Sequence, residues 1–295
     1  MHSQKRAYFF AISAILLWST VATAFKTALG GMSFANLLLI SSLVSVLLLG
    51  VVIVINKEIK TTLRIDFKSW LNSALLGFLN PFLYYMVLLK AYSMLPAQIA
   101  QPLNYTWPVV LVILSAPFLK QKITLKALAA LAICFCGVIV ISFQGKWDIN
   151  ISNPLGVFLA AGSSIIWSVF WLMNMKDRRK EISKLFLNFL FGFIYIGLYH
   201  LIYEPIKVSS TFSFIAAIYV GIFEMGITFI LWLTALRDSK SPEKISSLVF
   251  LSPFLSIFFI AFILHENIQI STVSGLLLIV LGIFLSKVKM KKAVK

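Results

Sequence analysis

Two stretches of this sequence decide the fold: GFLNPFLYYMVLLKA at residues 77–91 and GIFEMGITFILWLTA at residues 221–235. Each begins with glycine, carries a strongly polar residue three positions later (Asn80 or Glu224), and ends with alanine. Apart from Lys90 in the first and Thr228 and Thr234 in the second, the other residues are mainly apolar. The second stretch therefore looks like a copy of the first.

The match extends beyond these stretches. Leu17-Trp18-Ser19 corresponds to Ile166-Trp167-Ser168, and placing Pro108 on Pro253 aligns two helices and the loop between them without a gap. Apolar helices resemble one another by composition alone, but a gap-free match of this extent favours an internal duplication. We predict two repeats, at residues 1–146 and 147–295.

Composition indicates a membrane protein. Of 295 residues, 60% are hydrophobic and 12% are charged, which is too apolar for a soluble enzyme. A helix needs about 20 apolar residues to cross a bilayer. We predict an all-α integral membrane protein with ten transmembrane helices, at residues 7–28, 33–55, 69–92, 97–119, 125–143, 154–175, 185–203, 212–236, 245–264 and 270–286.

The basic residues give the orientation. Lys and Arg number 26 against 10 Asp and Glu, a net charge of +16. If the N-terminus is cytoplasmic and the loops alternate, 22 of the 26 fall inside and the others are Lys26, Lys90, Lys146 and Lys207. This asymmetry predicts that both termini are cytoplasmic. It also accounts for the positive net charge without nucleic-acid binding. Five helices per repeat then require that the second repeat be inverted, as in many secondary transporters.

Glu224 lies near the middle of a predicted span, whereas the other acids lie in loops or at helix ends. An ionisable residue at membrane depth usually faces a cavity or the bundle interior. On an α-helix, Asn80 shares a face with Tyr84, and Glu224 shares a face with Thr228. We predict that these four residues border a pathway; the alternative is a structural polar link between helices.

The span at 97–119 is unusually polar. Gln98, Gln101, Asn104 and Tyr105 lie within one arc of a helix together with Pro108. Pro102 and Pro108 each remove a backbone donor and favour a break in the helix. The freed carbonyls and amides suit a polar solute such as an amino acid, although the same amides could bond neighbouring helices.

Several tryptophans lie deep rather than at a membrane interface, among them Trp18 and Trp107. Trp167 and Trp171 share a helix face with Ser164. Such a face suits a solute with an apolar or aromatic part, and plain core packing is the alternative.

Catalytic signatures are absent from the sequence: it contains no H-E-x-x-H, Walker or G-x-S-x-G motif. The three histidines and the two cysteines, Cys134 and Cys136, show no metal-ligand spacing. We expect no enzyme activity, no cofactor and no metal.

The order of these features resembles the drug/metabolite transporter (DMT) superfamily, EamA type. The resemblance rests on Trp18-Ser19, Trp167-Ser168 and Pro253 followed by His265-Glu266-Asn267. It implies the EamA/DMT fold of two inverted five-helix repeats, a central cavity, alternating access and the bacterial cytoplasmic membrane.

Within that superfamily, Asn104-Tyr105-Thr106-Trp107-Pro108 is similar to a stretch of the aromatic amino-acid exporters. The similarity implies that Asn104, Tyr105, Trp107 and Pro108 belong to the pathway. Two features depart from the superfamily pattern: Gln121 replaces a glutamate, and the span at 33–55 lacks an arginine.

We therefore predict a secondary active or facilitative transporter that exports small metabolites, chiefly aromatic or neutral amino acids. Its partners would be the small-molecule substrate and the lipid bilayer, and the protein would be a monomer or a homodimer. The alternatives are another solute (a nucleoside, a sugar derivative or a drug), a channel, or a membrane-embedded protein that does not transport.

Overall fold

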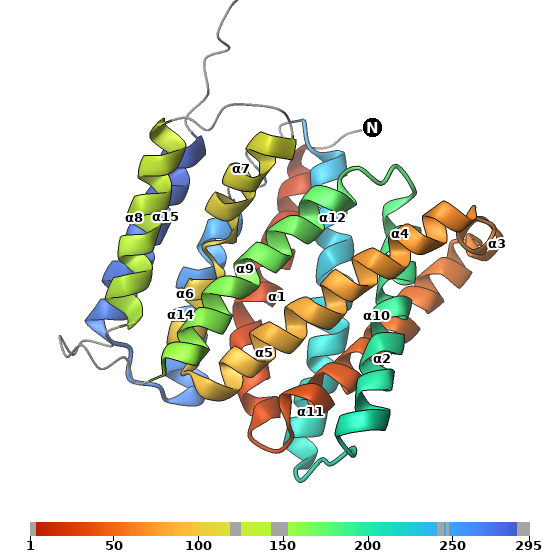
Figure 1. Cartoon of the computed structure of the whole chain (residues 1–295), viewed down its shortest axis with the longest axis horizontal. Helices are drawn as coiled ribbons and strands as arrows, with labels where there is room; N and C mark the ends of the chain where they lie inside the picture. Colours follow the sequence, from red (N-terminus) through yellow and green to blue (C-terminus); the bar gives the residue numbers. More distant parts are fainter. Residues whose placement is uncertain (1–3, 119–124, 143–152, 241–244, 246–247, 288–295) are drawn as a thin grey trace, which may run out of the picture.

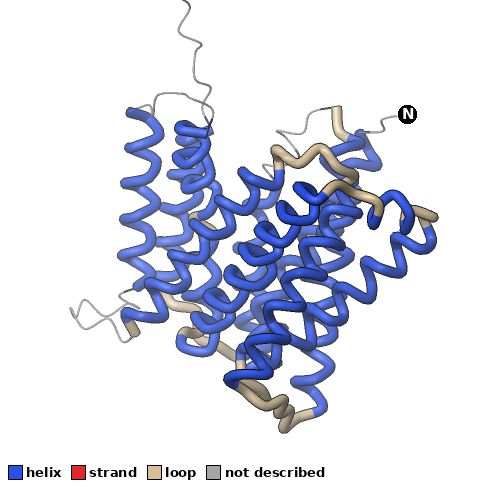
Figure 2. Tube along the Cα trace, turned by 45° about the vertical axis from the view of Figure 1, so that its right-hand side comes forward, coloured by secondary structure: helices blue, strands red, loops and turns tan. Residues whose placement is uncertain are grey.

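The computed structural model describes residues 4–118, 125–142, 153–240, 245 and 248–287, and in these ranges the protein is built from helices (Figures 1 and 2). Gln121, in the loop between two predicted spans, and residues 241–244 and 246–247, at the start of the predicted span 245–264, lie outside the described ranges. The first part of the chain forms α1 (Gln4–Leu29), α2 (Phe34–Ile55), α3 (Ile59–Leu63), α4 (Phe67–Gly77), η1 (Phe78–Leu83), α5 (Tyr84–Met94), α6 (Ala97–Asn104), α7 (Trp107–Phe118) and α8 (Leu125–Ser142). The second part forms α9 (Pro154–Asn174), α10 (Glu181–Tyr203), α11 (Thr211–Tyr219), η2 (Val220–Ile227), α12 (Thr228–Asp238), η3 (Val249–Leu251), α14 (Ser252–Leu264) and α15 (Ile270–Lys287).

Among the described residues, six continuous helical segments are long and apolar enough to cross a membrane. They are Gln4–Leu29, Phe34–Ile55, Phe67–Met94, Pro154–Asn174, Glu181–Tyr203 and Thr211–Asp238. Three shorter apolar helices occupy Leu128–Ile141, Val249–Leu264 and Ile270–Leu285. The chain is thus an all-helical, multi-pass membrane protein.

The segment predicted as one span at 97–119 is divided in two. α6 ends at Asn104 and α7 begins at Trp107, so that Tyr105 and Thr106 lie between two half-helices. The break falls between Pro102 and Pro108, which cannot donate backbone hydrogen bonds to the preceding turns. It places irregular backbone in the middle of the molecule, where it can line a cavity.

Both of the stretches quoted above are interrupted between two α-helical halves. η2 is a π-helix, whereas η1 is a kink at which the backbone of Asn80 is extended (φ −149°, ψ 119°) before Pro81. A π turn contains more residues than an α turn, and a kink changes the direction of the chain. Side chains before and after either interruption therefore no longer share the helix face that α-helical spacing assigns to them. This change of phase decides which polar side chains meet.

Glycine allows other helices to cross closely at η1 and η2. A Cβ atom on Gly221 would lie 2.5 Å from the carbonyl oxygen of Ser41, so α2 can cross η2 only because that side chain is missing. Gly77 makes the corresponding close approach to the backbone of Asn188 in α10. The α2 crossing is held by Ser45, whose hydroxyl donates to the Met225 carbonyl at 2.7 Å.

Two helices, α1 and α9, form the centre of the packing. α1 packs against α11, α12 and α14, whereas α9 packs against α5, α6 and α7 (Figure 1). α8 and α15 lie side by side at the edge of the molecule, where Gly137 faces the Gly275 carbonyl and the Cys134 thiol donates to Ile279. The inner helices thus converge on the break between α6 and α7.

Candidate functional site

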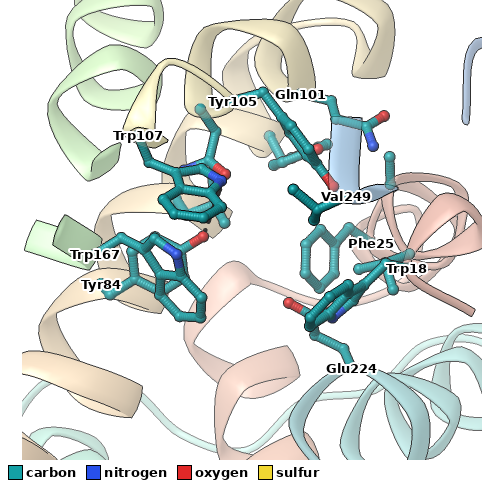
Figure 3. Close-up of a pocket in the computed structure, with 14 residues that line it drawn as sticks. Trp18, Phe25, Tyr84, Gln101, Tyr105, Trp107, Trp167, Glu224 and Val249 are labelled. Atoms are coloured by element: carbon teal, nitrogen blue, oxygen red, sulfur yellow. Dashed lines mark hydrogen bonds between the residues drawn. The ribbon is translucent and has the colours of Figure 1, made fainter. Parts of the chain in front are cut away.

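A small cavity of about 70 Å³, here called the chamber, lies where these inner helices meet (Figure 3). It receives side chains from α1, α5, α9 and η2, from the α6–α7 break and from η3. The lining residues are Trp18, Val21, Ala22, Phe25, Tyr84, Leu88, Tyr92, Gln101, Asn104, Tyr105, Trp107, Trp167, Glu224 and Val249.

Glu224 reaches the chamber from the π turn η2 and is 8% exposed. The Tyr85 hydroxyl donates a hydrogen bond to its Oε1 atom at 2.9 Å, and the indole of Trp18 lies beside the carboxyl group (Figure 3). The carboxyl group is thus hydrogen-bonded by the side chains of Tyr85 and Trp18.

Aromatic rings form most of the chamber wall. The Tyr84 and Trp167 rings lie 4.6 Å apart between centroids, and Trp107 lies beside them in Figure 3. On the other side, Trp18 packs against Trp232 with a centroid distance of 5.3 Å. Because these rings pack against one another, their positions do not depend on a bound ligand.

The amide groups in the wall are already engaged. Asn104 donates from Nδ2 to the Ser163 hydroxyl at 2.8 Å and accepts from the Tyr84 hydroxyl at 3.3 Å. Gln101 accepts a hydrogen bond from Ser256 of α14. These bonds tie the half-helix α6 to α5, α9 and α14, and they hold the chamber in shape.

A larger cavity of about 870 Å³, here called the vestibule, adjoins the chamber. Trp18, Trp107, Trp167 and Val249 line both spaces, so the two cavities share one wall. The vestibule extends along α7, α9 and α12 and reaches the loop between α9 and α10. Its other lining residues are Pro108, Leu111, Trp171, Asn174, Met175, Asp177, Glu181, Ile182, Lys184, Ile230, Trp232, Leu233, Thr234, Leu236, Arg237 and Phe250.

Ion pairs and hydrogen bonds fix the vestibule rim. The buried ammonium group of Lys184 donates to the carbonyls of Asn174 and Asp177, both at 3.2 Å, and pairs with Glu181 at 2.9 Å. Burial tends to raise the pKa of the Asp177 carboxyl, but hydrogen bonds and the charge of Arg179 outweigh it and bring that pKa below its ordinary value. These contacts also secure the end of α9.

At the end of the molecule away from the vestibule, hydrogen bonds tie α6 to the loop between α14 and α15. The Glu266 carboxylate accepts from the backbone N–H groups of Ala97 at 2.9 Å and of Gln98 at 3.2 Å, and so caps the N-terminus of α6 from a distant loop. The Gln98 side chain accepts from the Gln269 N–H at 3.0 Å and donates to the carbonyl of Asn267 at 3.0 Å. We call this set of bonds the lock.

Two further contacts reinforce the lock. The Thr272 hydroxyl donates to the Gln98 side chain at 3.1 Å. The Lys26 ammonium group donates to the carbonyls of Tyr92 and Leu95, both at 3.1 Å. Together they join α1, α5, α6 and α15 at the end farthest from the vestibule.

The structure brings many of the residues predicted from sequence into one place. Seven of them line the chamber: Tyr84, Gln101, Asn104, Tyr105, Trp107, Trp167 and Glu224. Pro108 and Trp171 line the vestibule.

Four predicted residues lie elsewhere. Asn80 and Thr228 are fully buried and are absent from the chamber wall. Asn80 lies at the kink η1, where its extended backbone breaks the α-helical spacing to Tyr84, and Thr228 follows the π turn η2, which changes the spacing from Glu224. Gln98 belongs to the lock. Ser164 accepts a hydrogen bond from Thr106 at 3.1 Å and so holds the α6–α7 break against α9.

Some residues of the site were not predicted from the sequence. Trp18 lines the chamber and corresponds to Trp167 in the other repeat, so the repeat itself indicates this residue. Tyr85 is not part of the chamber lining but contacts Glu224, and nothing in the spacing distinguishes it from its neighbour Tyr84. Phe25 and Val249 carry no sequence signal.

Comparisons with known proteins agree with this architecture. The model of the EamA-like transporter family matches residues 5–143 and 154–288. The uncharacterized transporter YvbV of Bacillus subtilis (strain 168) is 28% identical over 249 residues, which cover 83% of this chain and 79% of that protein. An uncharacterized transporter of Archaeoglobus fulgidus is 22% identical over 275 residues, covering 92% and 95%.

A solved structure shares the fold. A protein crystal structure superposes with a TM-score of 0.67 and 21% sequence identity, and the match covers 97% of each chain. At that level of identity the likeness concerns the arrangement of helices.

Proposed function

Because this chain belongs to the EamA-like transporter family, we propose that it exports small metabolites, chiefly aromatic or neutral amino acids, by alternating access. The observation that carries the proposal is that the chamber adjoins the vestibule through shared lining residues at one end, together with the lock at the other. A solute site that is open on one side only is what one state of such a cycle requires.

We infer that the chain has ten transmembrane helices in two inverted repeats, residues 1–146 and 147–295. The interruptions η1 and η2 occur at corresponding positions of the two repeats, although one is a kink and the other a π turn, and this correspondence supports the inference. The packing also corresponds: α2 crosses η2, and α10 crosses η1. The described helices leave room for this count, with α6 and α7 together forming one span.

The distribution of charge supports cytoplasmic termini. Basic residues are concentrated in the loop between α9 and α10 and in the loop that contains α3, and few are found at the lock end. The vestibule reaches the first of these loops. In a bacterial cytoplasmic membrane it would therefore open to the cytoplasm, and an exporter would load its substrate there.

The half-helices supply a plausible hinge for the transition. α6 carries the lock at its N-terminus and the chamber residues Gln101 and Asn104 along its length. Movement of α6 about the break before Trp107 would couple opening of the lock to a change in the chamber. If Pro108→Ala leaves both transport and conformational exchange unchanged, the break is not the hinge.

The chamber wall supports a substrate with an apolar or aromatic part, since Trp107 and Trp167 form a surface shared with the vestibule. The similarity of Asn104-Tyr105-Thr106-Trp107-Pro108 to the aromatic amino-acid exporters points to the same substrate class. The side-chain amides of Gln101 and Asn104 are already hydrogen-bonded to the protein, so they would orient a substrate without adding charge to the site.

Counterflow in liposomes of the purified protein tests the proposal, because it needs a pathway and no driving ion. Labelled phenylalanine, threonine and a nucleoside would be compared. We expect phenylalanine to accumulate and Trp167→Ala to abolish its accumulation. Trp70→Ala is the matched control, because Trp70 packs on Phe191 and lies outside the chamber.

Exchange of the nucleoside without either amino acid would replace the proposed substrate class. Absence of any exchange by the folded protein would contradict transport of all three solutes.

A further inference from the structure

The chamber has an unbalanced charge. Among the described residues that line it, Glu224 is the one carboxylate, and none is lysine or arginine. An ionised carboxylate at membrane depth needs a positive partner or strong hydrogen bonds. Tyr85 supplies one hydrogen bond to Oε1, and the Trp18 side chain supplies another to the carboxyl group. The wall itself supplies no cation.

Three cations on helices that line the two cavities have partners elsewhere. Lys26 of α1 lies beyond Tyr92 and donates to two backbone carbonyls of the lock. Lys184 at the vestibule rim is bonded to the end of α9 and to Glu181. Arg237 pairs with the neighbouring Asp238 at 3.3 Å and is largely exposed. A bound ligand is therefore the natural source of positive charge for Glu224.

The aromatic wall suits the same ligand. The faces of Trp and Tyr rings attract ammonium groups, and this attraction increases when water is excluded. Trp18, Tyr84, Tyr105, Trp107 and Trp167 all border the space next to Glu224 (Figure 3). Aromatic rings around a single carboxylate are a combination that favours organic cations over anions.

The two cavities differ in size, and this difference predicts the orientation of a bound ligand. The chamber, at about 70 Å³, holds a compact polar group, whereas the vestibule, at about 870 Å³, holds the body of a metabolite. The wall between them is aromatic. A ligand with a charged end and an apolar body would place its charged end in the chamber.

We propose that the chamber is an ammonium site, in which Glu224 and the surrounding rings bind the protonated amine of the substrate and leave its apolar body in the vestibule. This inference rests on the proposed function and narrows its substrate class to amines with an aromatic or other apolar body. An α-carboxylate is then dispensable. It would also lie close to Glu224, because an amino acid carries both charges on one carbon atom, and the like charges repel.

A competition experiment on the purified full-length protein tests the ammonium site by binding alone. Labelled phenylethylamine is displaced by unlabelled phenylethylamine, L-phenylalanine or 3-phenylpropionate, which share the ring and differ in charge. We expect phenylethylamine to bind roughly tenfold more tightly than phenylalanine, and 3-phenylpropionate to bind most weakly. The order of affinities of the wild-type protein for these three ligands tests the ammonium site without any variant.

Two variants add a test of the residue. Glu224→Gln keeps the shape of the side chain and removes its charge, so the preference for the amine over 3-phenylpropionate should fall about tenfold or more. Tyr85→Phe removes only the hydrogen bond and should keep that preference. Glu58→Gln is the matched control, because Glu58 pairs with Lys180 away from the chamber.

Equal binding of 3-phenylpropionate and phenylethylamine would overturn the proposal, as would an undiminished preference in folded Glu224→Gln or no binding of the amine. Counterflow separates this inference from the proposed function. Counterflow of phenylalanine without amine binding rejects the ammonium site alone. Amine binding with no counterflow of any solute keeps the ammonium site and rejects transport of those solutes.

Discussion

Replacing Glu266 by glutamine should weaken the lock and make the chamber accessible from the side opposite the vestibule. The carboxylate accepts two hydrogen bonds from the first turn of α6, at 2.9 Å and 3.2 Å, and its charge favours the positive end of that helix. Glutamine keeps one acceptor oxygen and loses the charge and the second acceptor. The bonds made by Gln98 remain, so the lock should loosen rather than disappear.

The size of the effect follows from these contacts. A hydrogen bond to a charged group contributes about 1.5–3 kcal/mol, and a charge at an exposed helix end about 0.3–1 kcal/mol. Glu266 is only partly buried, and one hydrogen bond survives the substitution, so we expect a net loss of about 1 kcal/mol. That loss increases the population with an open lock roughly fivefold.

Cysteine labelling measures this population. Leu88 lines the chamber, and a Leu88→Cys reporter can be placed in a protein whose Cys134 and Cys136 are replaced by alanine. A membrane-impermeant maleimide, added from the lock side, should modify the reporter roughly fivefold faster with Glu266→Gln. An unchanged rate in the folded variant, or an equal rise with the control Glu58→Gln, would refute the reasoning.

Two further changes test the packing and the rim. Gly221→Ala puts a methyl group 2.5 Å from the Ser41 carbonyl and should destabilise the protein by about 1–3 kcal/mol, whereas Gly162→Ala, with nothing within 4 Å, should be neutral or slightly stabilising; equal melting temperatures would contradict this assignment. The lowered pKa of Asp177 means that its carboxylate stabilises the folded state above its ordinary pKa of 3.8, and that this contribution disappears as the pH falls through the folded-state value. The melting temperature of wild type should therefore fall more than that of Asp177→Asn between about pH 5 and pH 3, and parallel curves would show that the contacts with Arg179 do not stabilise the fold.

Composition and local pattern determined the class of the protein. The length of apolar stretches sets which segments can remain in a bilayer as helices, and that condition depends on each segment alone. The positions of Pro102 and Pro108 likewise placed the break within residues 97–119, because a missing backbone donor acts locally. Glu224 was identified as a chamber residue for the same reason, since charge at membrane depth is costly wherever it occurs.

Tertiary structure decided which of the candidate side chains share the chamber. α-Helical spacing put Thr228 beside Glu224 and Asn80 beside Tyr84, but the π turn η2 and the kink η1 changed the phase of the two helices. Tyr85 meets Glu224 from 139 residues away, and Glu266 meets Ala97 from 169 residues away. Such contacts depend on how helices cross and how far each is shifted along its axis, and a pattern within one helix contains neither quantity.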